Sequence, residues 1–351
     1  MAPAKIDEIG TATRPEPANI ESGARKKRAL ITGVTGQDGS YLADFLLERG
    51  YTVFGLVRRT SKPNYENIQH ILDQPRDFQL IYGDLTDQGS INRAFIESTP
   101  DEVYNLGAQS FVGGSWDYPV STADITGLGA LRLLEAIRHF NPKCKYYQAS
   151  SSEMFGNQGG LLSEESPLLP RSPYGSAKVF AHNTTVNYRE SFGIYACSGI
   201  LFNHESPRRG LEFVTRKITD AVARIKLGLS DCVYLGNLDA SRDWGDARDY
   251  VRAMWLMLQQ EVPEDYVVAT GTSHTIRTFL QSAFGIVGIE EWESYVKIDP
   301  AFYRPAEIDV LIGDSSRARN ELGWEPQITF DEMVEDMVLN DIRRHNNANN
   351  N

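Results

Sequence analysis

The stretch Ala29-Leu30-Ile31-Thr32-Gly33-Val34-Thr35-Gly36-Gln37-Asp38-Gly39 decides the fold of this 351-residue chain. Its apolar start is typical of a β-strand, and three glycines spaced G-x-x-G-x-x-G lead into a helical pattern. Such glycines allow a tight turn, a close backbone approach to a pyrophosphate and close packing of helix on sheet. The helix N-terminus then presents free N–H groups to the phosphates. The stretch predicts a dinucleotide-binding turn; a glycine turn that binds nothing is disfavoured by the flanking strand and helix.

Outward from this turn, strands and helices alternate through the first half of the chain. The predicted strands are 28–32, 52–57, 78–82, 102–106 and 145–149, and the predicted helices include 37–49 and 124–140. Strands that alternate with helices form a parallel sheet covered on both faces. We therefore expect an α/β fold with a Rossmann-type, doubly wound parallel sheet.

The pattern changes after about Asn203, where a polar loop, 203–210, follows an apolar run. Later segments predict helices at 214–227, 247–259, 275–287 and 330–344 and a strand at 266–269. We expect these to build a smaller, mixed α/β C-terminal lobe for the substrate. The expected organisation is a disordered extension at 1–27, a dinucleotide-binding domain at 28–202 to which 236–270 returns, a second lobe at 203–235 and 271–344, and a disordered tail at 345–351.

Composition limits the classes of function. The formal net charge is −12, from 35 Lys and Arg against 47 Asp and Glu, which argues against a general nucleic-acid-binding protein. The cysteines Cys144, Cys197 and Cys232 are scattered, lack metal-ligand spacing and fit a reducing cytoplasm. No run is long and apolar enough to span a membrane, and residues 1–27 lack the apolar core of a signal peptide. We expect a cytoplasmic protein with neither a metal site nor a membrane partner.

The end of the second predicted strand indicates which dinucleotide binds. The strand runs into Val57-Arg58-Arg59-Thr60-Ser61. An acidic residue there would accept the ribose hydroxyls of NAD, whereas arginine binds the 2′-phosphate of NADP bidentately. The residues predict NADP+; the alternative is a solvated basic pair. Asp84, after the third strand, is expected to reach the adenine amino group, and the small residues of 105–110 let the cofactor lie close to the backbone.

Tyr174 and Lys178 are four residues apart, so a helix places both side chains on one face. An ammonium beside a phenol favours the phenolate and lowers the pKa of the tyrosine. Such a pair can move a proton on or off an alcohol. The spacing alone is common on helix surfaces, where Lys178 would simply be solvated. Its position downstream of the glycine turn makes a catalytic pair the preferred interpretation.

Four motifs together resemble those of the extended short-chain dehydrogenase/reductase family. They are Thr-Gly-x-Thr-Gly-Gln-Asp-Gly at 32–39, Asn-Leu-Gly-Ala-Gln-Ser at 105–110, Tyr-x-x-x-Lys at 174–178 and Phe-Asn-His-Glu-Ser-Pro-Arg-Arg-Gly at 202–210. Within that family the chain, from about Arg28 to Arg343, resembles the GDP-mannose 4,6-dehydratases. The motif at 203–210 and the segment 235–245 are specific to these enzymes and their nearest GDP-sugar relatives.

The resemblance implies a catalytic set of Ser151, Glu153, Tyr174 and Lys178. Threonine is usual in the family at the first of these positions, and Ser150 and Ser152 leave the assignment open by one position. Glu153 separates a dehydratase from an epimerase or reductase, because elimination of water requires a base for the C5 proton and an acid for the leaving hydroxyl. The alternative for Glu153 is a carboxylate in a surface loop.

The motifs and the resemblance together imply the ligand contacts. The expected cofactor-binding residues are Gly33, Thr35, Gly36, Gln37, Asp38, Gly39, Arg58, Arg59, Asp84, Leu85, Leu106, Gly107, Ala108, Gln109, Ser110, Tyr174, Lys178, His204 and Arg209. The expected substrate-binding residues are Ser110, Asn203, Lys217, Arg242, Arg304 and Glu307. Arginine suits a pyrophosphate because its guanidinium binds two oxygens at once. For each of these charged side chains the alternative is a surface ion pair.

The implied reaction converts GDP-mannose to GDP-4-keto-6-deoxymannose, with internal hydride transfer through tightly bound NADP+ that is regenerated in each turnover. Two other functions stay open: an NADP-dependent GDP-sugar epimerase or reductase, and a non-catalytic NADP-binding regulator. The resemblance also implies a homotetramer or homodimer without a nucleic-acid or membrane partner, in which the basic loop 58–64 reaches a neighbouring subunit. The residues leave the preferred sugar and the downstream pathway open.

Overall fold

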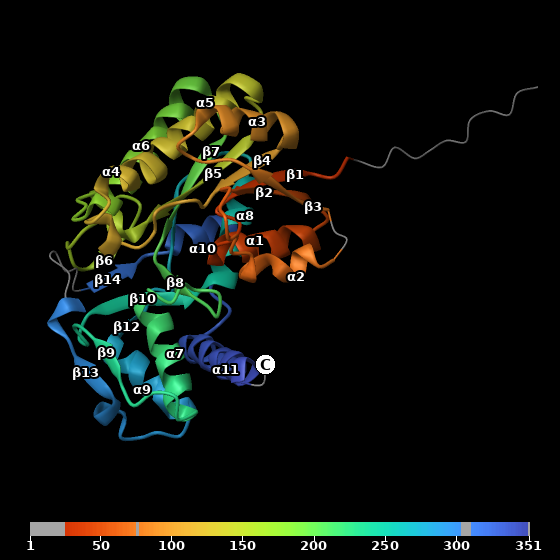
Figure 1. The fold of residues 1–351 in the computed structure, drawn as a ribbon. Coiled ribbons are helices and arrows are strands. Elements are labelled where there is room, and N and C mark those ends of the chain that lie inside the picture. The colour runs from red at the N-terminus through yellow and green to blue at the C-terminus, as the bar shows by residue number, and fades with distance from the viewer. Residues whose placement is uncertain (1–24, 75–76, 303–309, 350–351) are drawn as a thin grey trace, which may run out of the picture.

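The computed structural model describes residues 25–74, 77–302 and 310–349 (Figure 1). A sheet of seven strands in the order β11-β7-β5-β4-β1-β2-β3 forms the larger half of the molecule. Its strands are β1 (Arg28–Thr32), β2 (Thr52–Val57), β3 (Phe78–Tyr82), β4 (Glu102–Asn105), β5 (Lys145–Ser151), β7 (Ala196–Leu201) and β11 (Tyr266–Val268). All neighbouring strands pair in parallel. The sheet extends from β1 on both sides, with β2 and β3 on one side and β4, β5, β7 and β11 on the other. This order confirms the predicted doubly wound α/β sheet.

Helices cover both faces of this sheet (Figure 1). The helices α1 and α8 pack against each other on one face, and α3, α5 and α6 follow one another on the other. Leu30 and Ile31 of β1 belong to different apolar clusters, because successive side chains point to opposite faces of a strand. The helices of this half are α1 (Gln37–Glu48), α2 (Gln69–Leu72), α3 (Gln88–Ser98), α4 (Pro119–Thr122), α5 (Gly129–Phe140), α6 (Pro173–Phe192), α8 (Ala247–Gln259) and α10 (Ser316–Leu322).

The smaller half carries a second sheet, in the order β12-β10-β14-β6 with β8 beside β10, and a separate strand pair, β13-β9. Its strands are β6 (Leu161–Leu162), β8 (Asn203–Glu205), β9 (Val233–Leu235), β10 (Ser241–Asp246), β12 (Ser273–Thr275), β13 (Val296–Ile298) and β14 (Val310–Gly313). Its helices are α7 (Val214–Lys226), α9 (Ile276–Ile286) and α11 (Phe330–Asn349). Buried apolar side chains of these three helices, such as Ile218, Phe279 and Met333, form its core.

Two internal segments differ from the sequence-based expectation. The polar loop expected at 203–210 begins as β8, which pairs in parallel with β10. The helix expected over 124–140 begins as a π-helical turn, Ala123–Leu128, before α5.

The segment 236–270 was expected to return to the larger half. Within it, α8 and β11 join the larger half, whereas β10 lies in the second sheet. The division of the chain into domains stays a prediction.

The two ends of the chain were predicted to be disordered. Most of the extension, 1–27, lies outside the described residues, whereas the tail expected from 345 onward is helical to Asn349 as part of α11. His345 Nε2 lies 2.8 Å from Asp220 Oδ1 of α7, which holds this last turn against the molecule. Among the helices within 25–74, 77–302 and 310–349, none has the length and apolar character that a membrane crossing requires.

Candidate active site

A cavity of about 650 Å³ lies where the carboxyl ends of β4, β5 and β7 face the smaller half. The carboxyl edge of an open parallel sheet is the usual position for a ligand in this architecture. Many predicted site residues line it together. These are Asp38, Leu106, Ala108, Ser110, Ser151, Glu153, Tyr174, Lys178, Asn203, His204, Arg209, Lys217 and Arg242.

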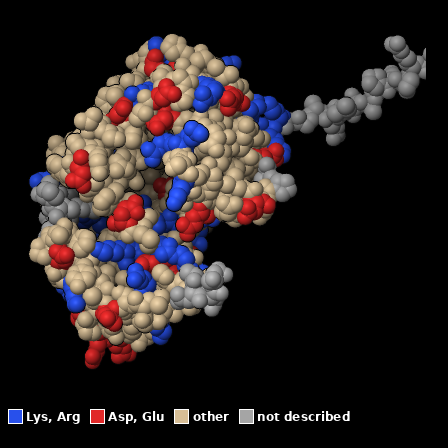
Figure 2. All heavy atoms as spheres, viewed as in Figure 1, with Lys and Arg blue, Asp and Glu red and all other residues tan. Residues whose placement is uncertain are grey.

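The charge around this cavity differs from the net charge of the whole chain. The net charge is −12. Figure 2 nevertheless shows Lys and Arg side chains gathered beside the hollow between the two halves, with acidic groups close to them. Lys178, Arg209, Lys217 and Arg242 all line the cavity. A local group of cations can therefore attract an anionic ligand to an acidic protein.

The glycine turn between β1 and α1 fits a dinucleotide. Gly33 has φ +71°, and a Cβ there would lie 2.9 Å from the Gly107 nitrogen at the end of β4. A Cβ on Gly39 would lie 2.3 Å from the Gly33 oxygen, so the helix start packs directly on the turn. A Cβ on Gly36 would meet only the Gly33 oxygen, at 3.2 Å, which leaves its other side open. The turn therefore presents open backbone and the N-terminus of α1 to a pyrophosphate.

The other predicted cofactor residues lie outside the lining of the cavity. They are Gly33, Thr35, Gly36, Gln37, Gly39, Arg58, Arg59, Asp84, Leu85, Gly107 and Gln109. Arg58 and Arg59 are exposed beyond the end of β2. The Asp84 carboxylate accepts hydrogen bonds from Thr86 of its own turn. Because β1 to β4 are neighbours, these residues extend along one edge of the sheet from the cavity, in the direction that a dinucleotide would follow.

Gln37 has a structural role that the sequence did not indicate. Its side-chain amide donates to Asp38 Oδ1 at 2.9 Å and to the His204 carbonyl at 3.1 Å, and its oxygen accepts from Ser206 Oγ at 2.8 Å. These three bonds use the side chain within the protein. Both hydrogens of the Gln37 side-chain amide are therefore used within the protein, so this side chain has no further N–H to donate to a cofactor.

The predicted catalytic residues meet where β5 ends and α6 begins. Ser151 is the last residue of β5, and its hydroxyl accepts from the Glu153 nitrogen at 3.2 Å. Ser172 caps α6 by accepting from the Gly175 nitrogen at 3.0 Å. A Cβ on Gly175 would lie 2.8 Å from the backbone carbonyl oxygen of Glu153. The glycine inside the Tyr-x-x-x-Lys motif thus lets α6 approach the turn that carries Glu153, and this approach brings Tyr174 to Ser151.

The surroundings of Tyr174 and Lys178 differ from the simple picture of a lysine beside a phenol. Burial raises the pKa of Tyr174 to about 12, and a hydrogen bond with Ser151 acts in the opposite direction. Burial lowers the pKa of Lys178 to about 8. The lysine ammonium donates to the Ala149 carbonyl at 2.6 Å and lies 5.6 Å from the centre of the Tyr174 ring. The expected lowering of the Tyr174 pKa by Lys178 is therefore not seen in this arrangement, because burial dominates.

A partly buried ion pair joins the glycine turn to β8. His204 Nε2 lies 2.8 Å from Asp38 Oδ2, and His204 Nδ1 lies 2.8 Å from the Phe202 carbonyl. Both partners are acceptors, so both ring nitrogens must carry protons and the ring is an imidazolium. Burial opposes this charge, but Asp38 raises the pKa of His204 above its ordinary value. In turn, His204 outweighs the effect of burial and lowers the pKa of Asp38 to about 2.

The adjacent arginines of the Arg-Arg-Gly motif have different environments. Arg208 points back to α1, where its guanidinium donates to Asp44 at 2.9 Å and lies 4.0 Å from the centre of the Tyr41 ring. Arg209 lines the cavity and forms an ion pair with Glu205 at 3.1 Å. Arg208 therefore holds the segment in place, and Arg209 faces the cavity.

The Asp38–His204 pair predicts a defined pH dependence of stability. The contribution of the pair to the free energy of unfolding is fully present between pH 3.8 and pH 6.5, the pKa values of Asp38 and His204 in the unfolded chain. It is lost as pH rises through the raised pKa of His204, and as pH falls toward about 2. Asp38→Asn is expected to lower the free energy of unfolding by about 2 kcal/mol near pH 6 and by less at pH 9.

Denaturant unfolding across this pH range measures the difference. Glu48→Gln is the matched control, because Glu48 is an exposed acid on the same helix. A difference between wild type and Asp38→Asn that stays constant from pH 6 to pH 9 would contradict a charged His204.

The comparisons with known proteins agree with this geometry. Residues 30–337 match the family model described as GDP-mannose 4,6 dehydratase. The chain belongs to the GDP-mannose 4,6-dehydratase family. It is 55% identical over 326 residues to GDP-mannose 4,6 dehydratase 1 of Arabidopsis thaliana, with 90% of each chain covered. It is 48% identical over 346 residues to the Homo sapiens GDP-mannose 4,6 dehydratase, with 92% of this chain and 93% of that one covered.

Solved structures extend the comparison to other nucleotide-sugar enzymes. The UDP-glucose 4-epimerase of Thermus thermophilus, solved with NAD, superimposes with a TM-score of 0.78 at 27% identity and covers 90% of this chain and 98% of its own. The Streptomyces venezuelae dTDP-glucose 4,6-dehydratase DesIV shares the fold, with a TM-score of 0.81 at 23% identity, over 92% of this chain and 98% of its own.

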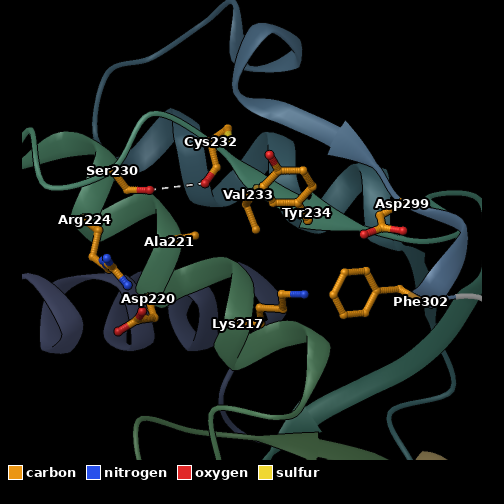
Figure 3. Close-up of a pocket in the computed structure, with 10 residues that line it drawn as sticks. All are labelled: Lys217, Asp220, Ala221, Arg224, Ser230, Cys232, Val233, Tyr234, Asp299 and Phe302. Carbon is orange, nitrogen blue, oxygen red and sulfur yellow. Dashed lines mark hydrogen bonds between the residues drawn. The ribbon is translucent and has the colours of Figure 1, made fainter.

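In this member of the GDP-mannose 4,6-dehydratase family, a smaller hollow of about 420 Å³ adjoins the main cavity (Figure 3). Lys217 and Phe302 line both. The Lys217 ammonium points toward the face of the Phe302 ring, 3.4 Å from its centre. Tyr234 and Asp299 also line the hollow, and Asp299 lies beside Phe302 (Figure 3). Of the predicted substrate residues, Arg304 and Glu307 lie outside the described residues.

Sequence reasoning missed several residues of the cavity wall. Glu205 is 2% exposed and forms an ion pair with Arg209. Glu205 belongs to the motif at 202–210, but the motif did not indicate that Arg209 would be its partner. Phe111, Trp116 and Phe213 also line the cavity. Their residue type did not indicate a place in the cavity wall, because apolar side chains next to strands and helix starts are usually core residues.

Proposed function

We propose that this chain converts GDP-mannose to GDP-4-keto-6-deoxymannose. The observation that carries the proposal is that Glu153 lines the same cavity as Ser151, Tyr174 and Lys178. A tyrosine–lysine pair suffices to oxidise an alcohol with a nicotinamide cofactor, whereas loss of water also requires a base and an acid. A carboxylate in a partly closed cavity can serve as both. Membership of the GDP-mannose 4,6-dehydratase family supports the same reaction.

Each catalytic residue has a defined step in this proposal. Tyr174 removes the proton of the C4 hydroxyl, and Ser151 orients the phenol through their hydrogen bond. A nicotinamide cofactor, when bound, would accept the hydride from C4 in its oxidised form and return it to C6 in its reduced form. Glu153 removes the C5 proton, which the C4 ketone acidifies, and delivers it to the leaving C6 hydroxyl. Tyr174 then returns its proton to C5, so the sugar loses one water and the protein is restored.

The two adjoining hollows suit the remainder of a GDP-sugar. Lys217 lies where they meet, and Asn203 and Arg242 line the larger one. In this proposal these three residues, with Arg304 and Glu307, hold the diphosphate and ribose, because two bridged phosphates require several cationic and hydrogen-bonding groups. The smaller hollow, with the aromatic faces of Tyr234 and Phe302, takes the base by stacking.

The exposed pair Arg58 and Arg59 favours NADP+ over NAD+ in this proposal. Replacing both by serine is expected to weaken NADP+ binding by about 10- to 100-fold, the loss of one or two charge-assisted hydrogen bonds. NAD+ binding is expected to stay nearly constant, because it lacks the 2′-phosphate. Calorimetric titration with each dinucleotide measures both effects. Lys62→Ser is the control, since Lys62 is an exposed cation in the same loop; equal weakening of both dinucleotides would contradict the assignment.

The reaction is tested by incubating the protein with GDP-mannose and a catalytic amount of NADP+. The expected result is a sugar nucleotide lighter by one water in mass spectrometry, with no net change in NADPH absorbance. Net consumption of NADPH in a parallel incubation that is supplied with NADPH would replace this proposal by a reductase. A product of unchanged mass with altered sugar stereochemistry would replace it by an epimerase.

We also infer a cytoplasmic homotetramer or homodimer. All three cysteines are free thiols, and Cys144 and Cys197 are buried, which suits a reducing compartment. The loop after β2, with Arg58, Arg59 and Lys62, is exposed and basic and is available to a neighbouring subunit. Light scattering of the purified protein measures the number of subunits; a monomer would contradict the inference.

A further inference from the structure

Two phenylalanine rings meet at the opening of the catalytic cavity. Phe111 follows β4 of the larger half, and Phe213 precedes α7 of the smaller half. Their ring centres are 6.0 Å apart and their planes are at 84°, an edge-to-face contact. Both rings line the cavity. Phe111 is also 36% exposed, which places the contact at the boundary with solvent.

The Phe213 ring is held by the charged network of the cavity wall. The Arg209 guanidinium lies 3.6 Å from the centre of the Phe213 ring, a cation–π contact. Arg209 is in turn paired with Glu205 at 3.1 Å, and Glu205 accepts from the Thr215 hydroxyl at 2.6 Å. Because Glu205 is nearly fully buried, this network fixes the position of the ring.

The Phe111 ring is held by its own loop. A Cβ on Gly113 would lie 3.1 Å from Phe111 Cζ, and a Cβ on Gly114 would lie 3.2 Å from Phe111 Cδ1. Both distances are tighter than ordinary van der Waals contact, so the two glycines make room for the ring to fold over the loop. Trp116, which also lines the cavity and is 46% exposed, continues the apolar rim.

We propose that Phe111 and Phe213 form an apolar latch that keeps water out of the cavity between elimination and hydride return. The inference rests on the function proposed above. Loss of the C5 proton and the C6 hydroxyl leaves a ketone conjugated to a C5–C6 double bond, and C6 is then electrophilic. Bulk water competes with the hydride for this carbon, and it adds its oxygen to C6 and its proton to C5. Apolar closure of a site suppresses such side reactions.

The test compares wild type with Phe111→Gln and Phe111→Leu, and with Leu211→Gln as a control. Leu211 is 47% exposed in the same loop as Phe213, and it does not belong to the cavity lining. The first readout is the coupling of water loss to hydride return during turnover of GDP-mannose. Phe111→Gln is expected to accumulate NADPH absorbance toward one equivalent per active site. Phe111→Leu and the control are expected to accumulate little, as wild type does.

The second readout does not depend on turnover. Acrylamide quenching of the fluorescence of bound NADPH, with GDP present, reports access of solutes to the cavity. We expect a quenching constant about threefold larger for Phe111→Gln than for wild type, because a polar side chain no longer closes the rim. Failure of wild type to release water from GDP-mannose would defeat the proposed function, and the quenching comparison would still decide whether the rings close the cavity.

Two results would overturn the latch. One is a Phe111→Gln variant that matches wild type in both readouts. The other is a Phe111→Leu variant that leaks as much as Phe111→Gln, because an apolar seal requires only an apolar side chain. A thermal melt of each variant, compared with the Leu211→Gln melt, separates leakage from partial unfolding.

Discussion

Tyr174→Phe is expected to lower kcat for the conversion of GDP-mannose by about 10³-fold, the loss of a positioned acid–base group. In the proposed mechanism the phenol is the acid–base group for the C4 hydroxyl, since Lys178 donates instead to the Ala149 carbonyl. KM for GDP-mannose is expected to change little, because the nucleotide contacts remain. Initial rates by mass spectrometry of the sugar nucleotide measure both constants.

Tyr188→Phe is the matched control for this prediction. Tyr188 lies on the same helix, α6, but its hydroxyl donates to Glu135 at 2.5 Å, away from the cavity. This variant is expected to keep the wild-type rate. A Tyr174→Phe variant that retains more than a tenth of the wild-type kcat would assign the proton transfer to another group.

The pKa of Tyr174 adds a pH dependence to the same measurement. Burial raises it to about 12, so the phenol carries its proton at neutral pH. In the proposed mechanism the phenolate is the catalytic base, and its fraction grows with pH below that value. The wild-type kcat/KM is therefore expected to rise between pH 6 and pH 8. A profile that falls over this range would contradict a phenolate base.

Glu153→Gln is expected to separate oxidation from elimination. Glutamine keeps the size of the side chain but cannot accept the C5 proton, so water loss is expected to fall by about 10³-fold. Oxidation at C4 depends on Tyr174 and is expected to continue. NADPH absorbance should then rise to a plateau near one equivalent per active site, which stopped-flow spectroscopy measures.

The backbone around Glu153 makes this variant interpretable. The Glu153 nitrogen donates to the Ser151 hydroxyl, and its carbonyl packs against Gly175, so both contacts survive the substitution. Glu165→Gln is the control, because the Glu165 side chain is 83% exposed. Water loss at the wild-type rate in Glu153→Gln would place the elimination base elsewhere. The absence of any NADPH plateau, together with lost water release, would make Glu153 necessary for oxidation as well.

The features that could be predicted from the sequence depend on short-range geometry. The glycine turn was predictable because its backbone conformation and its contact with α1 involve residues within one turn of chain. The strand positions were predictable for a similar reason, since a strand buried on both faces is a continuous apolar run. The shared face of Tyr174 and Lys178 follows from the helical period alone. The family motifs then directed attention to Ser151 and Glu153.

The same local patterns gave no prediction, or a wrong one, for contacts between segments that are far apart in the sequence. The Asn203–Glu205 segment was predicted as loop, yet it pairs with β10, about 40 residues away in the chain, as parallel strands require a long connection. Nothing in the sequence indicated that Arg208 would face α1 and Arg209 the cavity. The tail beyond 345 was expected to be disordered from its composition, but contact with Asp220 keeps it helical.

The sequence by itself determined the α/β class, the dinucleotide turn and the placement of the tyrosine–lysine pair on one helix face, because each depends on neighbours along the chain. Only the tertiary structure decided how these groups behave chemically. The pKa of Tyr174 is raised rather than lowered, His204 is charged through Asp38, and two distant phenylalanines close one cavity. Burial and long-range pairing depend on which segments pack together, and that information exists only once the chain has folded.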